Sequence, residues 1–230
     1  MKSSLFFGIL LSILAAGCVS PPVQTGNPAE YELPGLDNTT IFYLNVSSVQ
    51  VVENAINTTS VAVFIGESSE MNFMNPVAVD YSGNNASFNV STERIFGKVF
   101  AHFDFNSPFS GFVAFTQYVG QDFNYPLTKN GTIRVVLPIN YTGSGFLGVA
   151  QPQADNITKD ASGREVLLWE KPYPEYKSIR VKYHHKNAPT LLYYFFFSLF
   201  IGAVLVLGYY YFSLSALKKK RMIMEKDIRK

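Results

Sequence analysis

The sequence predicts an all-β ectodomain, an antiparallel sandwich of roughly ten strands, followed by one carboxyl-terminal transmembrane helix. Short runs of β-branched and aromatic residues alternate with Gly, Pro, Asn and Ser between residues 37 and 187. An uncharged segment of 30 residues follows at 188–217 and is long enough to cross a bilayer. A basic cluster comes directly after that segment, as is typical of a membrane stop-transfer signal.

The amino terminus has the three parts of an export signal, so residues 1–17 are predicted to be a signal peptide. A basic residue precedes an apolar run, and small residues close the segment. Ala16 and Gly17 lead into Cys18, as in a lipoprotein-processing site, although such sites usually carry Leu where this chain has Ala15. We therefore predict lipidation of Cys18. The alternative is an ordinary signal peptide whose cleavage region contains a cysteine.

Cys18 is the only cysteine in the chain, so the exported part can form no internal disulfide. This absence favours a prokaryotic envelope, where the fold is stabilised by packing alone. Residues 18–36 are rich in Pro, and we predict that they form a flexible, lipid-anchored tether with little capacity to pack.

Residues 37–187 are predicted to form the β-sandwich. A division into two smaller β-domains near 120–130 is the alternative, because all 11 basic residues of 19–187 come after position 93. Alternating apolar residues support several of the strands. The expected strands are Ile41–Val52, Ser60–Gly66, Pro76–Tyr81, Ala86–Val90, Lys98–Phe105, Phe112–Val119, Thr132–Pro138, Phe146–Ala150, Glu165–Trp169 and Ser178–Tyr183.

Eight acceptors for N-glycosylation occur in this region, more than chance spacing of Asn with Ser or Thr predicts. All of them lie between the two hydrophobic ends of the chain. We expect acceptors in turns to be modified more readily than one inside a strand, which is where the predicted strands place Asn45. The acceptors are Asn38, Asn45, Asn57, Asn85, Asn89, Asn130, Asn140 and Asn156.

The transmembrane helix is predicted at residues 188–217, with tyrosines near both ends. Tyr193 and Tyr211 would lie about 27 Å apart along a helix, close to the thickness of the hydrocarbon core. Residues 218–230 follow as a basic tail with seven basic and two acidic residues, whereas 19–187 has 11 basic and 15 acidic ones. This asymmetry predicts a single-pass cell-membrane protein with its ectodomain outside and its carboxyl terminus in the cytoplasm. The predicted stop-transfer residues are Lys218, Lys219, Lys220 and Arg221.

One pattern of residues is spread over the chain. It comprises Ala16-Gly17-Cys18, a strand running into Leu137-Pro138, a bend at Gly143 to Gly148, a strand ending at Trp169, the strand Ile179 to Tyr183, the apolar span and a basic end. This pattern resembles an uncharacterised family of archaeal membrane-anchored surface lipoproteins, mainly over residues 131–230. That family is a domain of unknown function, so the resemblance implies the anchored architecture and transfers no catalytic residue.

No motif for metalloprotease, nucleophile-elbow, phosphate-loop or dinucleotide chemistry occurs in the sequence. His184 and His185 are neighbours on a predicted strand and point to opposite faces, while His102 and Asp104 are interpreted as a solvated strand face. Asp80 and its neighbours read as a turn. We expect no metal site, no cofactor and no catalytic residue.

The favoured function is therefore a non-catalytic, membrane-anchored surface glycoprotein and lipoprotein that serves as an envelope scaffold or partner-recognition module. Its expected partners are the lipid bilayer and an envelope protein, and no nucleic acid. The alternative is an exported enzyme or a solute-binding lipoprotein with an unrecognised site. A cleft with convergent polar groups would favour the alternative.

Overall fold

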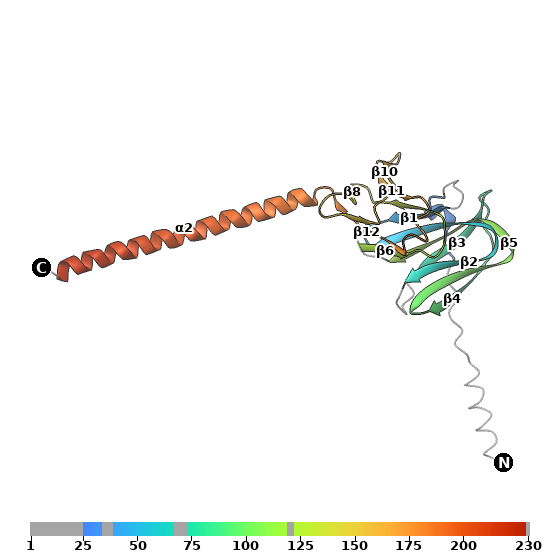
Figure 1. Ribbon diagram of the computed structural model, residues 1–230, viewed down its shortest axis with the longest axis horizontal. Coiled ribbons are helices and arrows are strands. Elements are labelled where there is room, and N and C mark those ends of the chain that lie inside the picture. Colours follow the sequence, from blue (N-terminus) through green and yellow to red (C-terminus); the bar gives the residue numbers. More distant parts are fainter. Residues whose placement is uncertain (1–24, 34–38, 67–72, 119–121, 229–230) are drawn as a thin grey trace, which may run out of the picture.

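The computed structural model describes residues 25–33, 39–66, 73–118 and 122–228. It consists of a β-rich region from which one long helix extends, as Figure 1 shows. The prediction of a β-rich fold with one carboxyl-terminal apolar helix is confirmed. The elements are η1 (Pro28–Glu30), β1 (Thr39–Leu44), β2 (Ser48–Gly66), β3 (Phe73–Asp80), β4 (Asn89–Ile95), β5 (Lys98–Tyr118), β6 (Asp122–Pro126), β7 (Thr132–Val136), β8 (Tyr141–Thr142), β9 (Val149–Gln151), β10 (Asn156–Lys159), β11 (Glu165–Trp169), β12 (Ser178–Lys182), β13 (His184–His185) and α2 (Ala188–Ile228).

The largest sheet has the strand order β10-β11-β7-β1-β2-β5-β3, with β4 also paired to β5. Every pair in it is antiparallel except β1 with β7, which run parallel from Thr39 opposite Thr132 onward. The sheet is therefore mixed, and the expectation of a purely antiparallel sandwich is wrong at this pair. A parallel neighbour requires a long crossover connection, and the chain between β1 and β7 supplies one.

Strands β2 and β5 are much longer than the sequence suggested. The predicted strand Lys98–Phe105 and the described part of Phe112–Val119 both belong to β5, and residues 106–111 between them remain within the strand. Strand β2 likewise continues through Asn57, where the pairing register shifts and φ is +46°. These shifts are β-bulges, in which an extra residue is left unpaired while the two strands stay paired on either side of it.

Other boundaries also differ from the expected ones. The predicted strand Ile41–Val52 is a hairpin, because the chain turns at residues 45–47 and Asn45 N donates to Ser48 O at 2.8 Å. Strands β6 and β10 were not predicted from the sequence. They are only five and four residues long, so their periodic signal is weak.

A second sheet, of order β6-β12-β9, packs against one face of the large sheet. The ring of Phe42 from β1 contacts those of Phe123 and Tyr125 from β6, with centroid distances of 4.9 and 4.5 Å. The same buried cluster includes Trp169 of β11 and Ile179 of β12. The two sheets thus share one hydrophobic core.

The opposite face of the large sheet is covered in part by residues 25–33, which belong to the expected tether. Tyr31 is buried in a second apolar cluster beside Val52 and Val77, and its hydroxyl donates to Asn75 O at 2.6 Å. These residues pack on the fold, so the expectation of a segment with little capacity to pack is wrong for them. Burial of one aromatic ring is sufficient to fix such a short segment.

Two residues separate β13 from helix α2, which starts at Ala188 and continues as one helix to Ile228. The part from Ala188 to Met224 is long and apolar enough to cross a membrane, and none of its most apolar stretch is buried against the rest of the protein. At 1.5 Å per residue the whole helix is about 60 Å long, roughly twice the hydrocarbon core of a bilayer. The basic residues 218–221 therefore continue the helix rather than end it.

Candidate functional site

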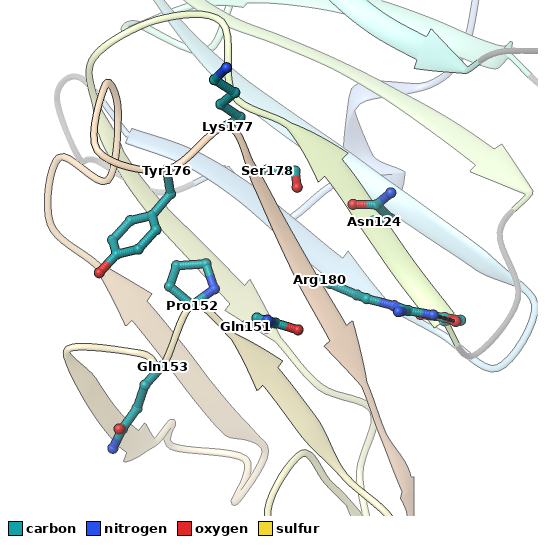
Figure 2. A pocket seen from close by; sticks show the side chains of 9 residues that line it. Asn124, Gln151, Pro152, Gln153, Tyr176, Lys177, Ser178 and Arg180 are labelled. Atoms are coloured by element: carbon teal, nitrogen blue, oxygen red, sulfur yellow. Dashed lines mark hydrogen bonds and ion pairs between the residues drawn. The ribbon is translucent and has the colours of Figure 1, made fainter.

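The outer face of the three-stranded sheet carries a polar groove that encloses about 860 Å³ (Figure 2). Alternate residues of β6 and β12 are buried, so the remaining ones point outward. The groove is lined by Asp122, Asn124, Gln151, Pro152, Gln153, Tyr176, Lys177, Ser178 and Arg180. The strands thus place amide, hydroxyl and charged groups on one surface.

Arg180 lies on β12, the middle strand of this sheet. Its backbone neighbours across the strands are Asn124 of β6 and Gln151 of β9, so an arginine stands between two amide residues in the register of the sheet. Adjacent strands lie about 4.8 Å apart, which gives these three polar groups a regular spacing. They form a row that runs across the sheet.

The guanidinium group of Arg180 is held in place by Asp122. Arg180 Nε donates to Asp122 Oδ1 at 2.8 Å and Nη2 to Oδ2 at 2.5 Å, and Lys182 Nζ lies 3.4 Å from the same carboxylate. The hydrogen bonds from Arg180 hold the pKa of Asp122 below its usual range, and the carboxylate raises the pKa of Arg180 in turn. Both groups are partly exposed, so this pair fixes orientation more than it adds stability.

Hydrogen bonds to backbone carbonyl groups fix the walls of the groove. Trp169 Nε1 donates to Pro152 O at 3.1 Å, which ties the segment after β9 to the core. Leu127 N donates to Lys177 O at 2.9 Å and joins the segment before β12 to the end of β6. The groove is therefore positioned by buried elements on both sides.

A second hollow of about 430 Å³ adjoins the groove and shares Asn124, Lys177 and Ser178 with it. Lys98, at the start of β5, also lines this second hollow. Among the residues that the structure describes, neither Lys98 nor Lys177 forms an ion pair. Within the described part of the chain, both ammonium groups are thus unpaired with a carboxylate.

The groove was not predicted from the sequence. Its residues come from three separate segments, and β6 was not predicted at all. The alternation in Asp122–Pro126, with Phe123 and Tyr125 turned inward, was the available signal. That signal is only five residues long and is easily missed.

A buried ion pair lies elsewhere, between Glu53 of β2 and Lys129. The Glu53 side chain is 2% exposed and the Lys129 side chain 53% exposed, and Lys129 Nζ donates to Glu53 Oε1. Within the described part of the chain, Glu53 Oε2 has no hydrogen-bond partner. Burial raises the pKa of Glu53, and the nearby Lys129 charge opposes that rise.

A second buried carboxylate, Glu165, supports the glycine-rich bend that follows β8. Its Oε1 accepts from Gly143 N at 2.9 Å, and its Oε2 accepts from Thr142 Oγ1 at 2.8 Å. Both oxygens are therefore paired with groups of the bend. The arrangement is structural, because it leaves no free group for a substrate.

The predicted glycosylation acceptors lie at the surface wherever the structure describes them. Seven are exposed, and none lies on β6, β9 or β12. Asn45 is in the exposed turn between β1 and β2, so its placement inside a strand was wrong. Asn38 and the predicted lipidation site Cys18 fall outside the described residues. The seven are Asn45, Asn57, Asn85, Asn89, Asn130, Asn140 and Asn156.

The histidines and Asp104 that were considered in the sequence do not line the groove or the adjoining hollow. His102 Nε2 lies 3.2 Å from Glu93 Oε2, and Asp104 accepts a hydrogen bond from Ser60 Oγ at 2.7 Å. His185 packs its ring on Tyr141 at the base of the helix. No group of three metal-ligating His, Cys, Asp or Glu side chains occurs among the described residues.

Two further expectations concern Asp80 and the basic cluster. The predicted turn at Asp80 is confirmed, because its Oδ1 accepts from the backbone N–H groups of Ser82 and Asn84, both at 2.8 Å. The stop-transfer residues Lys218, Lys219, Lys220 and Arg221 are exposed on α2.

Two comparisons with known proteins concern the family of this chain. Comparison with curated proteins found no match. The model of one family, described as a family of unknown function (DUF5803), matches residues 44–229, which include all the strands from β2 onward and all of α2. The chain therefore belongs to the DUF5803 family.

Proposed function

We propose that this protein is a non-catalytic cell-surface glycoprotein and lipoprotein that holds its β-region at the membrane as an envelope scaffold or partner-recognition module. The observation that carries the proposal is the junction between the sheets and α2. Only two residues separate β13 from the helix, and Lys186 N between them donates to Asn140 O at 2.9 Å. The last strand and the helix are thus directly connected.

Side-chain contacts stiffen the same junction. The hydroxyl of Tyr183 donates to Asn45 O at 2.5 Å, and the ring of Tyr141 contacts the rings of Tyr183 and His185 at centroid distances of 5.8 and 5.4 Å. A flexible stalk would let the β-region move freely, whereas this junction holds it close to the bilayer. Such an arrangement suits a protein that presents a surface at a fixed height.

The orientation follows from the distribution of charge and of acceptors. The eight acceptors precede residue 157, and the basic cluster at 218–221 follows the apolar part of α2. Basic residues beside a span favour the cytoplasmic side, and glycans are attached on the exported side. Both signals support an orientation with the β-region outside the cell and the carboxyl terminus in the cytoplasm.

The amino terminus supplies a second anchor in this proposal. Lipidation of Cys18 after removal of 1–17 would tie both ends of the β-region to the bilayer, and the absence of later cysteines together with abundant acceptors favours an archaeal surface. A Cys18→Ser variant should remain membrane-bound, because one lipid chain anchors far more weakly than a transmembrane helix.

The exported-enzyme or solute-binding alternative has one observation in its favour, the polar groove over β6, β12 and β9. Its only carboxylate, Asp122, is engaged by Arg180 and carries a lowered pKa, so it is a poor general acid or base at neutral pH. The groove therefore suits binding better than catalysis.

A topology experiment tests the proposal. The full chain carries an epitope after Lys230, and protease is added to sealed cells. We expect the β-region to be digested while the epitope survives on a small fragment until the membrane is opened. A matched variant with glutamine at 218–221 should show partial loss of that protection. An epitope that is accessible in sealed cells expressing the unaltered chain would contradict the orientation.

Glycan attachment gives the second measurement. Enzymatic or chemical deglycosylation should reduce the apparent mass of the native protein, and mass spectrometry should locate glycans on several of the eight acceptors. Eight unmodified acceptors in the native cell would refute the glycoprotein part of the proposal, even if the topology were correct.

A further inference from the structure

We propose that the groove over β6, β12 and β9 binds an acidic oligosaccharide, one that carries carboxylate or sulfate groups. This inference deepens the proposed function and rests on it, because it assigns a ligand class to the recognition surface that the anchored β-region presents. It concerns the groove centred on Arg180 and the adjoining hollow lined by Lys98.

The charge of the groove points to an anionic ligand. Residues 19–187 contain 15 acidic and 11 basic residues, so this part of the chain is acidic as a whole. The residues that line the two hollows reverse that balance, with three basic side chains and one acidic side chain, Asp122. Just outside them, Lys182 adds a basic group, and Glu175 and Asp155 beside Tyr176 add acidic ones. A basic concavity on an acidic protein attracts anions selectively. The basic residues are Lys98, Lys177, Arg180 and Lys182.

The polar row across the sheet suits hydroxyl-rich molecules. Asn124 and Gln151 each offer an amide donor and acceptor, and Arg180 between them offers planar donors in an orientation fixed by Asp122. Adjacent hydroxyl groups of a sugar ring can accept from and donate to such a row at once. The ring of Tyr176, at 40% exposure, provides an apolar face against which a pyranose ring can pack.

A peptide ligand fits the groove less well. Peptides that add to a sheet use its edge strands, whereas this groove lies over the face of the sheet. Amphipathic helices and proline-rich peptides need apolar or aromatic-lined channels, and here the outward side chains of β6 and β12 are mainly polar or charged. A saccharide needs neither an edge nor an apolar channel.

The distribution of glycosylation acceptors leaves the groove open. None of the seven acceptors that the structure describes lies on β6, β9 or β12 or lines either hollow. The protein's own glycans are therefore attached outside this face, while other exposed parts of the β-region carry acceptors. This distribution is expected for a surface that must stay accessible.

The test uses the full chain in detergent micelles and four probes: hexagalacturonate, a sulfated hexasaccharide, a neutral galactose hexamer and a glutamate hexapeptide. Calorimetry should show binding of at least one acidic sugar, at least tenfold tighter than that of the neutral hexamer and of the peptide. Loss of one charge-assisted contact changes affinity by about tenfold or more.

Matched variants locate the site. Arg180→Gln and Lys177→Gln should each weaken binding of the acidic sugar about tenfold, while Lys159→Gln, which removes one exposed charge from β10, should leave it unchanged. Fluorescence of the single tryptophan, Trp169, which is buried in the core, confirms that each variant is folded. Lys177 is exposed, so its substitution keeps the test valid if Arg180→Gln is unstable.

Four results would overturn the inference: no binding of either acidic sugar, equal binding of the neutral hexamer, equal binding of the peptide, or unchanged affinity in both groove variants. The outcome is separate from the topology test. Binding in micelles does not depend on orientation, so a failure here leaves the anchored architecture intact, and an inverted topology leaves the binding result intact.

Discussion

Substitution of Lys129 by Met should destabilise the β-region by an amount that depends on pH. Lys129 is the only described partner of the Glu53 carboxylate, whose side chain is 2% exposed and whose pKa is raised by burial. Breaking a fully buried ion pair costs about 3–5 kcal/mol. Because the Lys129 side chain is 53% exposed, solvent already screens part of the attraction, and we expect a loss of about 2–3 kcal/mol near pH 8.

The pH dependence follows from the direction of the pKa shift. The folded-state pKa of Glu53 lies above its unfolded value, so its contribution to stability is complete below the ordinary pKa of 4.5 and is lost as pH rises through the folded-state pKa. Removal of Lys129 raises that folded-state pKa further. The difference between Lys129→Met and the unaltered protein should therefore shrink below about 1 kcal/mol near pH 4 and grow as pH rises.

Trp169 fluorescence provides the assay. It is the single tryptophan, it is 1% exposed, and it belongs to the same β-region, so its emission reports unfolding of the sheets while α2 stays in the micelle. Urea titrations at each pH give the free energy of unfolding. The other carboxylates are common to Lys129→Met and the unaltered protein, so the difference in free energy of unfolding between these two proteins reports on Glu53.

A matched variant, Glu53→Gln, separates the ion pair from packing. It keeps the volume of the side chain but removes the titrating group, so it should be at least as stable as the unaltered protein at pH 8. Addition of Lys129→Met to it should cost less than about 1 kcal/mol at every pH. An equal loss for Lys129→Met at pH 4 and pH 8, or a pH-dependent loss in the double variant, would refute this reasoning.

Three further predictions use the same protein. Glu165→Ala should lower the free energy of unfolding by about 1–3 kcal/mol, because it leaves the buried Gly143 N–H without its acceptor. Urea titration measures this loss, and an unchanged free energy of unfolding would contradict the role of that hydrogen bond. Gly111→Ala should cost about 1–3 kcal/mol or more, because a Cβ there would lie 2.2 Å from a backbone oxygen, whereas Gly202→Ala, with nothing within 4 Å, should leave the Trp169 transition unchanged. Asn45→Gln should remove one glycan from the mature protein by mass spectrometry, since Asn45 lies in an exposed turn; an unchanged glycan mass would contradict its occupancy.

Much of the architecture could be predicted because its signals are local. The apolar run that becomes α2 and the alternating residues of β7 and β12 follow from periodicity within a few residues. The exposure of seven acceptors also agrees with the polar character of their segments. The structure changed the placement of Asn45, because a turn of three residues inside an apolar run is too short to interrupt the pattern.

The groove could not be predicted because it depends on contacts between distant segments. Residues 122–126, 149–151 and 178–182 become neighbours only when their strands pair, and the row of Asn124, Arg180 and Gln151 exists only in that register. The same holds for Glu53 and Lys129, which are 76 residues apart.

The sequence by itself determined which segments are apolar, which residues alternate and where the chain meets a membrane, because these properties depend on side chains that are close together in the chain. Only the tertiary structure decided that β7 lies parallel to β1, that β2 and β5 continue through their polar bulges, and that three short strands form the face with the groove. Strand partners are selected by backbone hydrogen bonds and a shared core, and both depend on the whole chain folding together.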